Sequence, residues 1–244
     1  MRENTVGSNG LTPAETHPLE KLAQLSPLHM EESVLRYGRE MSEADLNGFL
    51  APFAKSNAVL DETFVFKGKL HRGMQRLDDD GNCIYYLDGQ YSFALGYLRG
   101  KKQRPLWVAV TSFATDEIAS SYKESLVSSG VETDYNSILP LIVQIQGAAD
   151  WSFENKAMHR DAKKVLNKLR WEKALIALLL NWAEKNRVPA VYLLPSSMNR
   201  HRYNEDCTGR LHMRYDVTAR RMGFVQDGKG FYKKVVEPIS VNGQ

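Results

Sequence analysis

The sequence has few of the residues that build secreted, metal-binding or membrane-spanning proteins. Its 244 residues include only two cysteines, Cys83 and Cys207, which form neither a disulfide framework nor a metal-ligand spacing. The apolar stretch at residues 174–183 is about half as long as the roughly 20 residues that a transmembrane helix needs. The N-terminus lacks the apolar core of a signal peptide. We therefore expect a soluble, cytoplasmic protein with no membrane partner.

Positive charge is scarce in the first 150 residues and abundant afterwards. Residues 151–244 contain 18 Lys and Arg against 9 Asp and Glu, a net charge of +9, whereas the first 150 residues contain 14 against 20. A basic half favours an anionic partner such as a phosphorylated cofactor, a nucleic acid or an acidic surface. A solvated basic face would give the same count.

One domain with short tails accounts for the chain, because 244 residues that are 43% hydrophobic can bury one sizeable core. Residues 1–34 have few periodic apolar positions and are predicted as a flexible tail. Residues 35–237 are predicted as the domain and residues 238–244 as a C-terminal tail. Apolar runs separated by Asp-Gly and similar turns between residues 62 and 115 predict an antiparallel meander, and residues 118–127 predict an amphipathic helix.

A buried helix followed by a buried strand stands at the centre of the second half. Residues 174–183 are strong helix formers with Asn181 as their only polar member, which predicts a helix buried on most of its surface. Residues 188–195 are apolar and predict a strand buried on both faces. A strand at 141–146 and a polar connection at 148–164 precede this pair. The elements expected after it are a helix from about Leu211 to Met222, ended by Gly223, and a closing hairpin.

Two local signatures stand out in this order of elements. One is the strand 141–146 with the buried helix and strand that follow it, and the other is the segment 215–224, a helix that runs into a Gly-Phe step. In this order they resemble the Gcn5-related N-acetyltransferase (GNAT) fold over roughly residues 36–236. The resemblance implies a mixed α/β (α+β) domain with a largely antiparallel central sheet flanked by helices on both faces. It also implies an acyl-CoA-dependent N-acyltransferase that uses acetyl-CoA, or another acyl-CoA, as co-substrate.

The cofactor site follows from the same resemblance. In the GNAT family the strand before the long helix splays from its neighbour and exposes backbone groups to the pantetheine arm, and the glycine-rich helix start holds the pyrophosphate through N–H groups. Here the strand end would be Gln144, Ile145, Gln146 and Gly147, and the phosphate-binding turn would fall near Lys168, Leu169 and Arg170. Trp171 either packs in the core or forms a stacking wall for an adenine or an acceptor.

The sequence departs from the family pattern at the phosphate-binding turn. Arg170 and Glu172 stand where the family has small residues, and Gly147 is the only glycine between Val131 and Gly209. Basic side chains would therefore have to neutralise the phosphates in place of a glycine cradle. The candidates for that role are Lys163, Lys164, Lys168 and Arg170.

Acyl transfer needs a base for the amine, a donor for the thioester oxygen and an acid for the leaving thiolate. The family's usual tyrosine position is Ala219 here, but Tyr215 lies one turn earlier on the same helix face and is our candidate acid. Alternation along the strand predicts Leu141, Val143 and Ile145 on one face and Ile142, Gln144 and Gln146 on the other. A water held by Gln144 and Gln146 is one candidate base, and Glu172 and Asp216 are others. Tyr215 could equally be a half-buried helix aromatic.

Basic residues interleaved with aromatics support a different function. This pattern suits phosphate contacts and base stacking, so the chain could be a catalytically silent GNAT-fold protein that binds nucleic acid. A protein partner is a third possibility, since the fold alone decides none of these. His159, His201 and His212 lack ligand spacing, so no metal site is expected. The basic cluster consists of Arg200, Arg202, Arg210, Arg214, Arg220 and Arg221.

Overall fold

The computed structural model describes residues 27–59, 61–70, 75–77, 83–86, 89–98, 105–114, 140–147, 156–199, 205–227 and 230–236. Several expectations lie outside the described residues. They concern residues 1–26 and 237–244 of the tails, the helix at 118–127, and Arg200 and Arg202 of the basic cluster.

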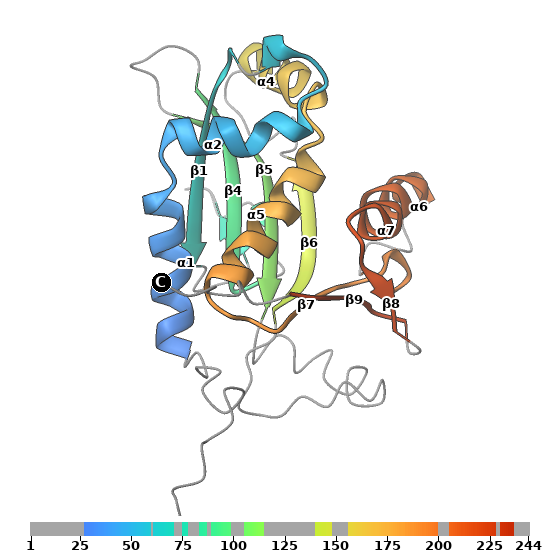
Figure 1. Cartoon of the computed structure of the whole chain (residues 1–244). Helices are drawn as coiled ribbons and strands as arrows, with labels where there is room; N and C mark the ends of the chain where they lie inside the picture. Colours follow the sequence, from blue (N-terminus) through green and yellow to red (C-terminus); the bar gives the residue numbers. More distant parts are fainter. Residues whose placement is uncertain are drawn as a thin grey trace, which may run out of the picture.

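A seven-stranded sheet in the order β1-β4-β5-β6-β7-β9-β8 forms the centre of the molecule (Figure 1). Every neighbouring pair is antiparallel except β6 and β7, which run parallel. The mixed α+β class with a largely antiparallel sheet is thus confirmed. In sheet order the strands are β1 (Thr63–Leu70), β4 (Tyr91–Leu98), β5 (Leu106–Ala114), β6 (Leu141–Gly147), β7 (Ala190–Leu193), β9 (Tyr232–Val235) and β8 (Val225–Gln226). A separate hairpin pairs β2 (Gln75–Leu77) with β3 (Cys83–Tyr86).

Helices α1 (Pro27–Glu40), α2 (Glu43–Leu50) and α5 (Trp171–Lys185) lie over one face of the sheet (Figure 1). Two short 3₁₀ turns, at Ala51–Phe53 and Asn57–Val59, lead from α2 to β1. The main core forms between these helices and the sheet, and Trp182 of α5 is fully buried against Phe93 and Phe113. The prediction of a helix buried on most of its surface is confirmed. None of the described helices is both long enough and apolar enough to cross a membrane.

The domain begins earlier than the sequence predicts. Helix α1 starts at Pro27, inside the stretch expected to be a tail, and Met30 and Val34 are fully buried in the main core. A close backbone approach explains how α1 reaches β1. A Cβ atom on Gly68 would lie 2.1 Å from the Val34 carbonyl oxygen, and one on Gly38 would lie 2.1 Å from the Gly68 nitrogen. Two glycines therefore let helix and strand touch main chain to main chain.

The described part of the connection between β6 and α5 is helical, whereas a polar loop is expected over residues 148–164. Helix α4 (Lys156–Asn167) occupies its second half, and a three-residue turn then leads into α5. The segment is rich in charged residues, and among its described side chains Ala162 and Leu166 are buried in the core and Val165 packs against it. Apolar residues at 158, 162, 165 and 166 have the i, i+4, i+7, i+8 spacing of an amphipathic helix, so this helix could have been predicted from the sequence.

After β7 the chain forms a 3₁₀ turn (Ser196–Met198) and then a continuous helical stretch in three parts. These are α6 (Glu205–His212), a π-helical segment η6 (Met213–Val217) and α7 (Thr218–Arg221). The expected helix is present but starts earlier and contains a π-helical turn. Gly223 has a φ of 78° and ends the helix as predicted, because glycine adopts this left-handed conformation without strain. The closing hairpin of β8 and β9 is confirmed.

Candidate functional site

The parallel pair β6–β7 separates almost as soon as it forms. Only Leu141 and Ile142 of β6 have partners in β7, and the last bond across the pair runs from the Leu194 N–H to the Ile142 carbonyl at 3.0 Å. Strand β6 continues to Gly147 with its other edge paired to β5. From Val143 onward, the edge of β6 that faces β7 has no strand partner among the described residues. Strands β6 and β7 therefore diverge after Ile142.

A bulge in β6 changes which of its side chains share a face. The register with β5 shifts between Ser112 and Phe113, so that Val143 is the extra residue. Ile145 consequently packs in the main core with Ile142, and Leu141 and Val143 pack in the second core cluster on Tyr192 and Phe231. The prediction that Ile145 shares a face with Leu141 and Val143 is wrong, because simple alternation cannot include a bulge.

Two side chains from η6 contact the unpaired edge of β6. The Ile145 N–H donates a hydrogen bond to the Tyr215 hydroxyl at 3.0 Å, and the Arg214 Nη1 lies 3.5 Å from the Ile145 carbonyl oxygen. Tyr215 is 3% exposed, so its ring is part of the core rather than a half-buried surface group. The Tyr215 and Arg214 side chains of η6 therefore bond the edge of β6 that a neighbouring strand would otherwise pair with.

Gln144 and Gln146 lie on the same side of β6, as predicted, and contact each other. The Gln144 Nε2 donates to the Gln146 Oε1, and the Ser112 hydroxyl donates to the Gln144 Oε1 at 3.1 Å. Gln144 is 4% exposed and is engaged at both ends of its amide. Of the two glutamines, only Gln146 at the open end of the strand is partly exposed, so it is the better placed to meet a water or a ligand.

The carboxyl end of β6 lies against the start of α5. A Cβ atom on Gly147 would lie 3.6 Å from the Trp171 ring, and the Arg214 guanidinium lies 5.3 Å from the centre of the same ring. Trp171 is 6% exposed and belongs to the main core, so core packing accounts for most of its surface. The ring still links β6, α5 and η6 at one point.

The turn expected to bind phosphate has no free N–H cradle. The N–H groups of Lys168, Leu169 and Arg170 donate to the carbonyls of Val165, Leu166 and Phe53 at 3.0, 2.9 and 3.0 Å. The Arg170 bond, together with the bond from the Lys55 N–H to the Lys168 carbonyl at 2.9 Å, joins the α4–α5 turn to the segment after α2. The side chains of Lys168 and Arg170 are exposed and remain able to contact an anion.

Glu172, in the first turn of α5, has a perturbed pKa. Burial raises the pKa of this carboxyl above its usual value, and three weaker effects lower it: a hydrogen bond from its own backbone N–H and the charges of Arg214 and Lys55. A carboxyl with a raised pKa beside an arginine is a common feature of functional sites. Glu172 is therefore the candidate base that the structure supports more directly than the glutamines.

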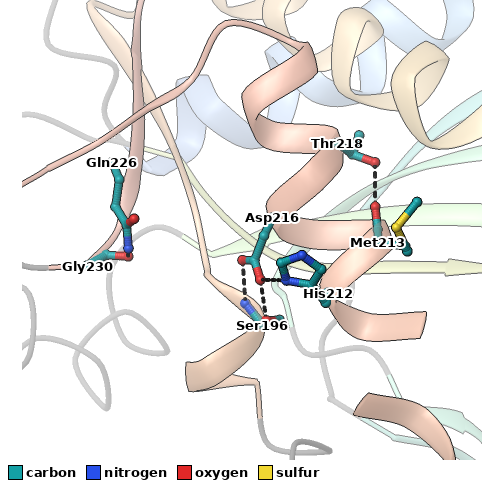
Figure 2. A network of polar contacts seen from close by, with 7 residues as sticks. All are labelled: Ser196, His212, Met213, Asp216, Thr218, Gln226 and Gly230. Atoms are coloured by element: carbon teal, nitrogen blue, oxygen red, sulfur yellow. Dashed lines mark hydrogen bonds and ion pairs between the residues drawn. The ribbon is translucent and has the colours of Figure 1, made fainter. Parts of the chain in front are cut away.

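Asp216 is the centre of a second polar network, on the β7 side of the opening (Figure 2). Its carboxylate accepts the Ser196 N–H at 3.0 Å, the Ser196 hydroxyl, and the His212 Nδ1 at 2.8 Å. The Asp216 side chain is 10% exposed and that of His212 is 50% exposed. One signal in the sequence could have found this network, the i, i+4 spacing of His212 and Asp216, whereas nothing in the sequence links Ser196 to them.

The basic cluster is only partly a surface feature. Arg210, Arg220 and Arg221 are exposed, but Arg214 turns inward to Ile145 and Trp171. Among the described residues, no group of three or more His, Cys, Asp or Glu side chains could hold a metal ion.

Comparisons with protein-family models, with curated proteins and with solved structures gave no significant match. A mixed α+β fold with a seven-stranded sheet is what the structure establishes.

Proposed function

We propose that this chain is a GNAT-like, acyl-CoA-dependent N-acyltransferase, which moves an acyl group, typically acetyl, from a thioester to an amine by direct attack. The observation that carries the proposal is the opening between β6 and β7. There Ile145 offers one N–H and one carbonyl to a tyrosine and an arginine instead of to a strand.

A pantetheine arm could use this opening because it is a short chain of amides. Its amides can pair with the backbone of Ile145 as an added strand would. Tyr215 and Arg214 would then exchange their contacts with Ile145 for contacts with the arm. Since one hydrogen bond replaces another, the net cost of the exchange is small. The Tyr215 hydroxyl would remain beside the thioester, where it can donate a proton to the leaving thiolate.

The pyrophosphate of the cofactor would be held by side chains at the start of α5. Lys168 and Arg170 are exposed there, and the positive end of the helix dipole adds to their attraction. Glu172 opposes this attraction when it is ionised. We expect the affinity for CoA to reflect the balance of these three side chains rather than a backbone cradle.

Calorimetric titration with acetyl-CoA, with free CoA alongside, tests the proposal directly. We expect micromolar binding by the wild-type chain and weaker binding by the double variant Lys168→Gln/Arg170→Gln. Lys185→Gln, at the opposite end of α5, is the matched control and should bind like the wild type. Failure of the wild-type chain to bind at millimolar acetyl-CoA would refute the proposal. Equal binding by the double variant would remove the two basic side chains from it.

A nucleic-acid-binding function is the second candidate, favoured by the exposed Arg220 and Arg221 at the end of α7 and by Arg210 on α6. Binding of this kind releases counterions, so the affinity for a short single-stranded oligonucleotide should fall steeply with salt. The double variant Arg220→Gln/Arg221→Gln should reduce both the affinity and the salt dependence. Absent or salt-independent binding would exclude this function.

A further inference from the structure

We propose that His212, oriented by Asp216, is the general base that takes the proton from the acceptor amine. This inference rests on the proposed acyltransferase function and gives the role of base to His212 instead of to Glu172 or a water held by Gln144 and Gln146. It starts from the 2.8 Å contact between the His212 Nδ1 and the Asp216 Oδ2.

The contacts of Asp216 determine the tautomer of His212. An ionised carboxylate offers only acceptors, and it already receives the N–H and the hydroxyl of Ser196. The His212 Nδ1 must therefore carry the proton in this contact, which leaves the lone pair of the neutral ring on Nε2. Half of the His212 side chain is exposed, so the ring can be reached from outside. A buried carboxylate that fixes the tautomer of an accessible histidine is an arrangement suited to proton transfer.

One helical segment carries both this pair and the proposed acid, Tyr215. Tyr215 and Asp216 are consecutive, yet Tyr215 contacts Ile145 of β6 and Asp216 contacts Ser196 just after β7. The π-helical segment thus joins the two strands where they diverge. His212 precedes Tyr215 by three positions on the same continuous helix, so the two side chains leave it within about one turn of each other. An amine that approaches from the β7 side would meet His212 first.

The position of Ser196 argues against an acyl-enzyme route. In a Ser-His-Asp triad the serine hydroxyl bonds the histidine, but the Ser196 hydroxyl bonds the carboxylate instead. Ser196 therefore holds Asp216 in place and is not activated by His212. The base is left to act on the acceptor itself.

The proton and electron balance of the step is simple. The amine nitrogen gives a proton to the His212 Nε2 as its electron pair forms the new C–N bond with the thioester carbon. The C–S bond breaks and its electrons stay on sulfur, which takes a proton from the Tyr215 hydroxyl. His212 returns its proton through solvent to Tyr215. The products are an amide and free CoA thiol.

The test measures thiol release from acetyl-CoA with spermidine, a lysine-containing peptide and a peptide with a free α-amino group as acceptors. His212→Asn keeps a donor where Nδ1 stands but has no basic nitrogen. We expect it to reduce turnover about 10²- to 10⁴-fold. Its calorimetric affinity for acetyl-CoA should stay within about twofold of the wild type, because the Asn donor preserves the contact with Asp216. His212→Ala should regain part of its turnover when imidazole is added, which a merely structural role would not allow. Lys185→Gln, an exposed change at the end of α5, is the control and should match the wild type.

The outcomes separate this assignment from the function on which it rests. Wild-type turnover by His212→Asn would overturn the assignment and leave the proposed acyltransferase standing. Loss of turnover together with loss of acetyl-CoA binding, and no recovery with imidazole, would also overturn it, since His212 would then be structural. No thiol release by the wild-type chain with any acceptor would refute the proposed function and the assignment together.

Discussion

Replacing Tyr215 by phenylalanine removes a single oxygen atom from the point where β6 leaves β7. That oxygen accepts the Ile145 N–H at 3.0 Å, and the ring around it is 3% exposed. The phenylalanine ring fills the same volume, so the core packing of the π-helical segment should survive. The variant therefore isolates the hydroxyl from the rest of the side chain.

Two effects of different size should follow. The Ile145 N–H becomes a buried donor without a partner, which costs about 1–3 kcal/mol of unfolding free energy. For a chain of this size each kcal/mol corresponds to a fall in melting temperature of about 2–4 °C. If Tyr215 also protonates the thiolate, turnover should fall by about 10²-fold, the low end for general acid catalysis.

Thermal melts and acetyl-CoA-dependent thiol release measure these effects separately. Tyr37→Phe is the matched control. The buried Tyr37 hydroxyl donates to the Oδ1 of Asn181 on α5 at 2.9 Å, and it has no part in the contacts at the opening between β6 and β7. It should lose comparable stability and keep its turnover. If Tyr215→Phe keeps full turnover, Tyr215 has no catalytic role. If it keeps full stability, the bond to Ile145 contributes nothing.

Further predictions concern the packing of α1 and the charge at α5. Gly68→Ala should cost about 1–3 kcal/mol or more, because its Cβ atom would lie 2.1 Å from the Val34 carbonyl oxygen. A Cβ atom on Gly48, in the interior of α2, would meet nothing within 4 Å, so Gly48→Ala should instead raise the free energy of unfolding by about 0.5–1 kcal/mol. Urea denaturation measures both variants. Similar changes in the two variants would contradict the close approach of α1 and β1. Because burial raises the pKa of Glu172 in the folded state, its stabilising contribution is present at low pH and is lost as the pH rises through the raised value. Glu172→Gln should therefore melt at a higher temperature than the wild type, by a margin that grows from about pH 4 to pH 7. A margin that shrinks over this range would show that the charges of Arg214 and Lys55 outweigh burial.

Much of the fold follows from local patterns in the sequence. The apolar residues of α5 leave no polar face, so the helix has to be buried, and β7 is apolar on both faces because a core cluster lies on each side of it. Ser42 begins α2 because its side chain accepts the Asp45 N–H at 3.1 Å, and the serine and the acidic residues after it are visible in the sequence. Such features depend on residues a few positions apart, which is why pattern reasoning finds them.

The candidate site depends on contacts that no local pattern contains. The sequence singled out Tyr215, Ile145 and Asp216, but it could not predict that Tyr215 contacts the backbone of a strand 70 residues away. It also missed the bulge at Val143, because one extra residue changes the face of every later side chain and leaves no mark on composition.

The sequence by itself therefore determined the buried helix–strand pair and the end of the last helix at Gly223, since each is fixed by hydrophobic periodicity or by backbone preference. Only the tertiary structure decided that β6 and β7 separate after Ile142 and that η6 joins them. It also decided that His212, Asp216 and Ser196 form one network. The physical reason is that these features arise from hydrogen bonds between segments distant in sequence, whose geometry is set by the packing of the whole sheet.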